Sequence, residues 1–447
     1  MKRDIYIKLS SWKHSKHRNP LIITGARRVG KTHILREFGR YYYTNTAYFN
    51  FETDPTLNSI FLNHQEPGQL FDVLSTRSNT TILPFKTLVI FDEIQNAPAA
   101  LDSLSFSNED TDQYHVAATS SFPGIKIAQT STFQNGTIDF LNLFPLTFRE
   151  YLNVVGKSRL RHILEDKKDF TPLPTRIHEQ LIFHLKTYCF VGGMPEAVNQ
   201  YVIDRDLMKV RQIHLSILES YTQDISTYST PAQAARIKGI WNAVIDFLSE
   251  KNKKFKISVL SRNARTRDYK DAVHWLIDEG LVYRCDHIRK PGIPINRYIE
   301  DNNYKLYLLD TGLLATLLGL SPGIIDQGDN IFSGFNYAIA ENFTAQELLT
   351  DSLSAENHLN ELFFWTNCHK TDVPFILQKG EDFYPIDVRY GKVKEKTGLK
   401  IYSEKYSTPM LSLATPMNFE HEGNLFNYPL YSLSSFPIPI KEPSRKF

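Results

Sequence analysis

The chain has 447 residues, which is too long for one ordinary hydrophobic core, so we expect two or three domains. Hydrophobic residues make up 42% of the sequence and charged residues 22%, values typical of a folded chain rather than a disordered one. The formal net charge of only +2 excludes a globally basic nucleic-acid binder, so any such surface has to be local.

Cysteine spacing and hydropathy narrow the class of protein further. Cys189, Cys285 and Cys368 lie far apart and lack the paired spacing of a disulfide framework or a zinc site. No apolar run approaches the roughly 18 residues of a membrane span, and the first residues lack the apolar core of a signal peptide. We therefore expect a cytoplasmic protein with reduced thiols and no membrane partner.

Residues 1–18 form a short amphipathic segment, in which a few apolar residues are set among many basic ones. One interpretation is an element that packs on the edge of a sheet. The other is a cover over the adenine of a bound nucleotide, because the segment leads directly into the next motif. The sequence leaves both interpretations open.

A phosphate-binding loop follows at residues 25–32, where the sequence reads G-x-x-x-x-G-K-T. The apolar residues 21–24 precede it as a strand, and residues 33–38 continue it with helical spacing. Two glycines let the backbone turn tightly enough to aim N–H groups at phosphate oxygens. Lys31 is expected to reach the β- and γ-phosphates, and Thr32 to ligate Mg²⁺. The expected ATP contacts are Gly25, Ala26, Arg27, Arg28, Val29, Gly30, Lys31, Thr32 and His33.

A second part of a nucleotide site is predicted about 60 residues after the loop. Residues 46–52 alternate like a strand, and residues 57–74 are expected to be helical with a break at a Pro-Gly pair. The apolar strand 87–93 then ends in two carboxylates. Asp92 is expected to hold Mg²⁺ through water, and Glu93 to orient and deprotonate the attacking water.

Residues 114–121 are predicted to form a strand that ends in hydroxyl side chains. In ATPases of this architecture such a strand lies between the phosphate-loop strand and the carboxylate strand, and a polar residue at its end senses the γ-phosphate. Thr119 and Ser120 are the candidates. An ordinary turn at the end of a strand is the alternative.

The middle of the chain is predicted to be largely helical. After a strand and a helix start in residues 137–151, helical spacing continues to about residue 250, and Pro195 opens a helix after a Gly-Gly turn. Residues 253–286 suggest a winged helix-turn-helix, with a helix closed by a glycine before a strand. Its local positive charge suits DNA, although a role in protein packing is equally open. The basic residues are Arg262, Arg265, Arg267 and Lys270.

The last third of the chain is predicted to be an α+β domain. An apolar helix at residues 334–350 carries Glu341 and Glu347, and three strands follow between residues 362 and 388. The spacing within this domain does not identify a chemistry.

Taken together, these segments resemble a family of prokaryotic predicted ATPases of the AAA+ type with a C-terminal domain of unknown function. The resemblance implies a P-loop core of the ASCE type, a helical lid, a winged helix, and a terminal domain similar to the PD-(D/E)XK nuclease fold. It also implies a nucleotide contact at Pro195 in the lid. The phrases that carry it are G-A-R-R-V-G-K-T (25–32), F-D-E-I-Q (91–95), P-L-T-F-R-E (145–150), G-G-M-P-E (192–196), L-L-D-T-G-L (308–313) and E-N-F (341–343).

Two departures from the family pattern bear on activity. Thr137 stands where the family carries an arginine near the γ-phosphate, which weighs against fast hydrolysis. In the terminal domain, Pro374 replaces a metal-binding aspartate and Arg389 replaces a lysine, while Glu341 and Asp387 are retained. Arginine stays protonated and cannot serve as a tunable proton partner, so the nuclease-like domain is expected to be inactive.

We therefore predict an α/β protein with a P-loop NTPase core of the ASCE/AAA+ type. The predicted domains are residues 1–152 for the ATPase core, 153–235 for the helical lid, 236–315 for the winged helix, and 316–447 for a C-terminal α+β restriction-endonuclease-like domain.

The leading functional hypothesis is a Mg²⁺-dependent ATPase whose nucleotide state moves the lid and the winged helix. One alternative is a nucleotide-gated switch that hydrolyses little ATP, and another is a Mg²⁺-dependent nuclease acting through Glu341 and Asp387. The partners that remain open are DNA, another protein and a second copy of the chain. Arg149, Arg159 and Arg161 are candidates for an arginine supplied to a neighbour's site.

Overall fold

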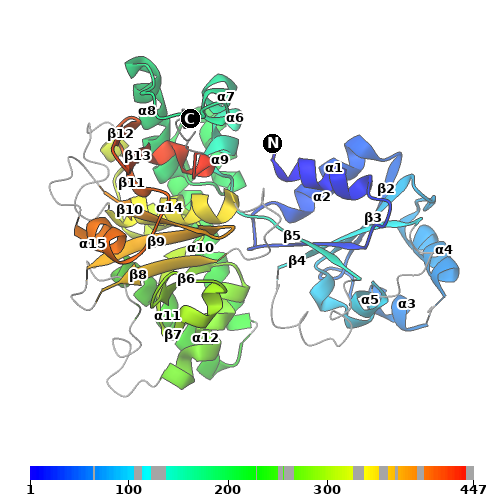
Figure 1. The fold of residues 1–447 in the computed structure, drawn as a ribbon. Coiled ribbons are helices and arrows are strands. Elements are labelled where there is room, and N and C mark those ends of the chain that lie inside the picture. The colour runs from blue at the N-terminus through cyan, green and yellow to red at the C-terminus, as the bar shows by residue number, and fades with distance from the viewer. Residues whose placement is uncertain are drawn as a thin grey trace. The chain divides into compact units, whose positions relative to one another are not determined.

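The computed structural model describes residues 1–63, 66–104, 113–121, 137–227, 229–249, 255, 266–325, 337–351, 361–367, 371–389 and 397–438. Two compact units contain them, and each has its own sheet (Figure 1). The first unit is Met1–Phe144 with Asp278–Leu281, and the second is Pro145–Ile277 with Val282–Phe447. Within the described ranges, no helix combines the length and the apolar character needed to cross a membrane.

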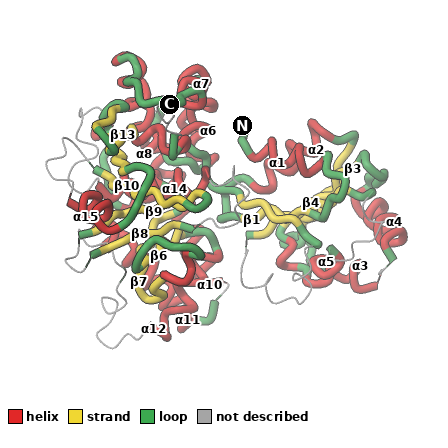
Figure 2. The backbone as a smooth tube through the Cα atoms, viewed as in Figure 1, coloured by secondary structure: helices red, strands yellow, loops and turns green. Residues whose placement is uncertain are grey.

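The first unit is built on a parallel sheet of five described strands in the order β2-β3-β4-β1-β5. Figure 2 labels β1, β3 and β4 among its yellow strands. The strand β4 lies between the phosphate-loop strand β1 and the carboxylate strand β3, as the sequence predicts. Parallel strands end at one edge of a sheet, so this order brings the ends of β1, β3 and β4 together. The strands are β1 (Leu21–Thr24), β2 (Asn45–Asn50), β3 (Thr87–Asp92), β4 (His115–Ser120) and β5 (Asp139–Asn142).

Helices cover both faces of this sheet, with α1 and α2 on one face and α3 and α5 on the other (Figure 1). Ile34, Leu35 and Phe38 are buried on one side of α2, which is the face that the helical spacing predicts. The N-terminal segment forms α1, and its Tyr6 ring lies 6.4 Å from the Phe38 ring of α2. The helices are α1 (Ile5–Lys13), α2 (Lys31–Tyr42), α3 (Leu57–Asn63), α4 (Pro67–Ser78), α5 (Pro98–Ser103) and the short 3-10 helix η1 (Ile94–Asn96).

The second unit contains a mixed sheet of eight described strands in the order β12-β13-β11-β10-β9-β8-β6-β7. The strands β6 and β7 form an antiparallel hairpin, and β6 also pairs in parallel with β8. Strands from both sides of residue 315, the predicted end of the winged-helix domain, thus belong to one continuous sheet. The strands are β6 (Val282–Ile288), β7 (Ile299–Leu308), β8 (Leu362–Thr366), β9 (Asp372–Lys379), β10 (Asp382–Val388), β11 (Leu411–Thr415), β12 (Glu420–Glu422) and β13 (Leu425–Pro429).

Helices precede and flank this second sheet. Phe363 and Trp365 of β8 pack in one core with Leu399 and Tyr402 of α15, while Tyr307 of β7 contacts α14. The α-helices are α6 (Phe148–Val154), α7 (Ser158–Glu165), α8 (Thr175–Val191), α9 (Pro195–Asp204), α10 (Leu207–Thr227), α11 (Pro231–Ser249), α12 (Thr266–Asp278), α13 (Thr311–Leu317), α14 (Tyr337–Asp351) and α15 (Thr397–Lys405). The 3-10 helices are η4 (Ile295–Tyr298), η5 (Pro322–Ile325) and η9 (Leu430–Ser435).

The segment predicted to be a winged helix contains α11, α12 and the β6–β7 hairpin in that order. Arg267 and Lys270 are exposed on α12. Arg262 and Arg265 lie outside the described residues. The winged helix and its DNA-binding role therefore stay predictions, as do the four domain boundaries.

Three of the family phrases in the second unit are joined by hydrogen bonds around the buried carboxylate of Asp310. This carboxylate accepts hydrogen bonds from Gly193 N at 2.6 Å and from Leu313 N at 3.0 Å, where it caps α13. Gly193 in turn accepts a hydrogen bond of 2.7 Å from Leu146 N. A Cβ on Gly192 would lie 2.2 Å from Asp310 Oδ1, which leaves room only for glycine. The phrases thus form one buried polar connection within the unit.

We expect Asp310→Ala to destabilise the second unit by about 2 kcal/mol or more, because two buried N–H groups would lose their acceptor. Thermal unfolding followed by circular dichroism measures the effect as a lower midpoint. Asp301→Ala is the control, because Asp301 is exposed on β7. Equal midpoints for the two variants would contradict the structural role of Asp310.

The effect of Asp310→Ala is also expected to depend on pH. Burial raises the pKa of Asp310 to about 6, against the opposing effect of its backbone hydrogen bonds. Between about pH 4 and pH 6, Asp310 keeps its proton in the folded protein, whereas the unfolded chain has released it. The stabilisation that Asp310 contributes to folding is therefore complete below about pH 4 and is lost as the pH rises through about 6. The destabilisation by Asp310→Ala should be larger at about pH 4.5 than at about pH 7.5, by about 2 kcal/mol.

Candidate functional site

The phosphate loop joins the end of β1 to the start of α2. Gly25 and Gly30 have φ values of 142° and 99°, and Arg28 between them has a φ of 67°. A Cβ on Gly25 would lie 2.2 Å from Leu143 O, so a side chain cannot be placed there without moving the backbone. The positive φ angles at both glycines belong to a tight loop that ends at the N-terminus of α2, which is the geometry that binds phosphate oxygens through backbone N–H groups.

Lys31 is the first residue of α2 and is buried. Its Nζ donates hydrogen bonds to Gly25 O at 2.8 Å and to Ala26 O at 3.0 Å, so the side chain folds back over the loop. Burial lowers the pKa of Lys31, and the carboxylates of Glu93 and Asp92 oppose this shift. A phosphate bound in the loop would favour the charged ammonium in the same way.

Asp92 is the centre of the hydrogen-bond network at the end of β3, and only 3% of its surface is exposed. Its Oδ1 accepts from Thr32 Oγ1 at 2.7 Å and from Thr119 Oγ1 at 2.5 Å. Its Oδ2 accepts from Tyr48 OH at 2.6 Å and from Asn50 Nδ2 at 3.1 Å. The two predicted Mg²⁺ ligands, Thr32 and Asp92, are therefore brought together. Thr119 donates a hydrogen bond to the same Asp92 carboxylate.

Glu93 follows Asp92 with a left-handed φ of 56°, which is uncommon for a residue with a side chain. Its backbone N donates to Thr119 Oγ1 at 3.0 Å. Its carboxylate accepts from Ser121 Oγ at 3.0 Å and from Gln95 Nε2 at 2.5 Å. Two side-chain contacts thus hold the half-buried carboxylate, and the third holds a backbone in an unfavourable conformation, as is typical of functional sites.

Sequence reasoning did not identify Tyr48, Asn50, Gln95 and Ser121 as parts of this site. The alternation in β2 was a usable signal, because Tyr48 and Asn50 fall on the same face near the end of a strand. In the sheet Asn50 pairs with Asp92, so the two polar ends are direct neighbours. Gln95 and Ser121 lie beyond strand ends, where the path of the chain cannot be derived from periodicity.

The remaining predicted contacts lie in different places. His33 is exposed on α2, and Arg27 pairs with Glu52 at 3.0 Å. Ser120 is fully buried at the end of β4. Pro195 begins α9 in the second unit, and its contact with nucleotide stays a prediction. Among the described residues, no group of three or more His, Cys, Asp and Glu side chains is arranged to hold a metal ion.

Family models match three parts of the chain. Residues 17–152 match the model of the AAA domain. This stretch contains the phosphate loop, Asp92 and Glu93, and together with the parallel sheet it supports a P-loop ATPase of the AAA type. Two domains of unknown function match residues 182–323 (DUF8612) and 338–431 (DUF4143). The comparison with curated proteins returned no match.

Solved structures are similar to this chain at low sequence identity. The Walker-type ATPase PABY2304 of Pyrococcus abyssi is 14% identical over 71% of this chain and 96% of that chain, with a TM-score of 0.46. RuvB of Thermotoga maritima, a Holliday junction branch migration motor, is 13% identical over 64% and 87%, with a TM-score of 0.29. Drosophila ORC bound to DNA is 15% identical over 71% and 94%, with a TM-score of 0.26.

A second group of carboxylates lies in the other unit, where sequence reasoning predicted a nuclease-like site. Each of the three acids is engaged by a protein donor. The pairs are Tyr307 OH with Glu341 Oε2 at 3.0 Å, Lys305 Nζ with Asp372 Oδ2 at 3.2 Å, and Arg389 Nε with Asp387 Oδ2 at 2.8 Å.

Two of the three carboxylates in this second group have a cationic partner, Lys305 for Asp372 and Arg389 for Asp387. Burial raises the pKa of Asp387 to about 6, while the neighbouring Arg389 guanidinium opposes the shift. Burial alone would lower the pKa of Lys305, but the carboxylates of Glu341 and Asp372 outweigh it and raise the pKa. Sequence analysis did not identify Lys305 as a partner of these carboxylates. Its position as a lysine in the apolar end of β7 could have indicated a buried ion pair.

Proposed function

We propose that the protein binds ATP with Mg²⁺ in the AAA-type core and hydrolyses it. The observation that carries this proposal is the network around Asp92, in which the carboxylate contacts Thr32 of the phosphate loop at 2.7 Å and shares Thr119 with Glu93. It joins both halves of a P-loop site through side chains. Mg²⁺ is commonly held by one or two protein oxygens together with substrate phosphates, which suits Thr32 and Asp92.

The residues of the site divide the chemistry between them. The loop amides and Lys31 would bind the phosphates, and Mg²⁺ would neutralise charge on the phosphate oxygens. Glu93 would accept a proton from the water that attacks the γ-phosphorus while the bond to the ADP oxygen breaks. Ser121 and Gln95 orient the Glu93 carboxylate for this step, and Thr119 positions both Asp92 and Glu93.

Steady-state hydrolysis of ATP by the full-length protein tests this function. We expect phosphate release with Mg²⁺ and none with EDTA. Duplex DNA should be present in a parallel series, because the exposed Arg267 and Lys270 of α12 fit a DNA-coupled ATPase. Absence of ATP binding by the folded protein would exclude the proposal.

Thr137 favours one second function, a nucleotide-gated switch with slow turnover. It precedes β5 in the place where the related family carries an arginine, and this removes one source of positive charge for the transition state. Tight ATP binding with negligible turnover, with and without DNA, would support the switch. Turnover well above roughly 1 s⁻¹ by the isolated protein would exclude it.

We propose that the C-terminal domain is not a nuclease. A nuclease of this type requires carboxylates that are available to Mg²⁺, whereas Lys305 and Arg389 already neutralise Asp372 and Asp387. The order of helix α14, strands β8 to β10, helix α15 and strand β11 is compatible with the predicted nuclease-like fold without implying its activity.

Neither the wild-type protein nor Asp387→Ala should accordingly cleave plasmid DNA. We expect the wild-type protein and this variant to leave supercoiled plasmid intact with Mg²⁺ or Mn²⁺ over hours. Agarose gels of the relaxed and linear forms provide the measurement. Cleavage by the wild-type protein that disappears in Asp387→Ala would refute the assignment.

A further inference from the structure

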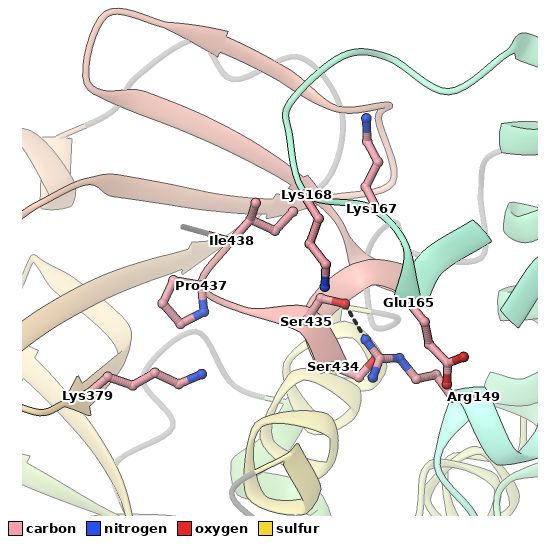
Figure 3. Close-up of a pocket in the computed structure, with 9 residues that line it drawn as sticks. All are labelled: Arg149, Glu165, Lys167, Lys168, Lys379, Ser434, Ser435, Pro437 and Ile438. Carbon is pink, nitrogen blue, oxygen red and sulfur yellow. Dashed lines mark hydrogen bonds between the residues drawn. The ribbon is translucent and has the colours of Figure 1, made fainter. Parts of the chain in front are cut away.

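A pocket of about 260 Å³ lies within the second unit (Figure 3). Four elements form it: the start of α6, the end of α7 with the loop that follows, the end of β9, and η9 with the residues after it. The lining residues are Arg149, Glu165, Lys167, Lys168, Lys379, Ser434, Ser435, Pro437 and Ile438.

The lining of this pocket is strongly basic. It contains four cationic side chains and one carboxylate, and that carboxylate, Glu165, already pairs with Arg161 at 2.6 Å. Lys167 is paired with Asp169. Lys379 Nζ donates to Phe436 O at 2.9 Å, a neutral acceptor. With four cations and one carboxylate, the lining carries a net positive charge.

Two buried polar atoms of the lining lack a protein partner. Arg149 Nη2 donates to Ser435 Oγ, but Arg149 Nε has no hydrogen-bond partner within the described part of the chain. The same holds for the hydroxyl of Ser434, whose surface is only 7% exposed. Leaving a buried donor without an acceptor costs about 1–3 kcal/mol. Both atoms are shielded from solvent, so a bound acceptor reaches them only when their side chains turn toward the pocket.

We propose that this pocket binds a small phosphate-bearing anion, such as a phosphomonoester or a pyrophosphate. An oxyanion with two or more negative charges matches the excess of cations, and its oxygens would accept from the ammonium groups of Lys168 and Lys379 and from the guanidinium of Arg149. Arginine suits phosphate because its planar donors can bind two oxygens at once. Pro437 and Ile438 supply an apolar wall for the carbon part of an ester.

The size of the pocket favours a small ligand over a macromolecule. At about 30 Å³ for each water molecule, the volume corresponds to roughly nine waters. Pockets for drug-sized molecules typically begin at about 300 Å³. Every lining residue belongs to the second unit, so the site is separate from the phosphate loop and does not depend on the proposed ATPase.

Calorimetric titration with inorganic pyrophosphate tests the proposal. A Lys31→Ala background removes binding in the phosphate loop, which would otherwise hide the second site. In this background we expect saturable binding of one pyrophosphate that weakens with salt. Adding K168E/K379E should weaken it by roughly tenfold or more, because reversing two charges replaces attraction with repulsion.

The matched control is K86E/K400E, which changes the net charge equally at two exposed lysines outside the pocket. It should change the affinity less than about twofold. Equal losses in the two double variants, or no pyrophosphate binding in the Lys31→Ala background, would overturn the proposal. Loss of binding to a single-stranded oligonucleotide with unchanged pyrophosphate affinity would overturn it in favour of a nucleic-acid surface.

Arg149→Gln provides an independent variant, should charge reversal disturb folding. It retains a polar side chain but removes the guanidinium, and we expect at least about tenfold weaker pyrophosphate binding. Circular dichroism should show an unchanged fold. Wild-type affinity in the folded Arg149→Gln variant would contradict the role of this residue.

Discussion

Glu93→Gln should leave ATP bound to the protein while hydrolysis falls by about 100-fold or more. Glutamine has the same shape and can still accept one of the hydrogen bonds from Ser121 and Gln95, so the site should keep its structure. It cannot accept the proton of the attacking water. Steady-state phosphate release and equilibrium binding of a fluorescent ATP analogue measure the two effects separately.

Glu66→Gln is the matched control for this experiment, because Glu66 is an exposed carboxylate before α4. It should hydrolyse ATP at the wild-type rate. If Glu93→Gln also retained that rate, another group would have to accept the proton. Thr119→Val would then deserve comparison, because it removes the hydroxyl that positions both Asp92 and Glu93.

Lys31→Ala is expected to weaken ATP binding itself by about 100-fold or more, because charge-assisted hydrogen bonds to phosphate are among the strongest in proteins. The folded protein should survive the change, since the bonds lost are those from Nζ to Gly25 O and Ala26 O of the same loop. Binding measured with Mg²⁺ present checks the prediction. Lys86→Ala, on an exposed lysine before β3, controls for the loss of one positive charge.

An unchanged ATP affinity in Lys31→Ala would place the nucleotide elsewhere, and the assignment of residues 25–32 as the phosphate site would fail. Lys31→Arg distinguishes charge from shape. We expect it to restore little of the affinity, because the larger guanidinium does not fit the place of a compact, buried ammonium.

The fold of the first unit could be predicted in detail because its signals are local. The apolar runs at β1 and β3, and the spacing of Ile34, Leu35 and Phe38 on α2, each follow from a few neighbouring residues. The position of β4 between β1 and β3 came from the architecture that the phosphate loop implies. Phosphate binding restricts the residues of this loop so strictly that the G-x-x-x-x-G-K-T pattern can be recognised in the sequence.

The partners of Asp92 could not be predicted in the same way. Tyr48 and Asn50 reach it from β2, 44 and 42 residues away in sequence, and only strand order and register bring them together. Asp310 illustrates the same limit in the second unit. The phrases around it could be recognised as a family pattern, but their reason, a shared buried carboxylate, requires contacts over more than 100 residues.

The pairing of β6 with β8 has a consequence for dividing the chain. A protein that began at residue 316 would lack the β6–β7 hairpin, and one edge of β8 would expose its N–H and C=O groups to solvent. Unpaired strand edges recruit strands from other molecules, so such a fragment is expected to aggregate. The hairpin covers the edge of β8 in the C-terminal sheet, and it should be retained in any fragment intended to stay monomeric.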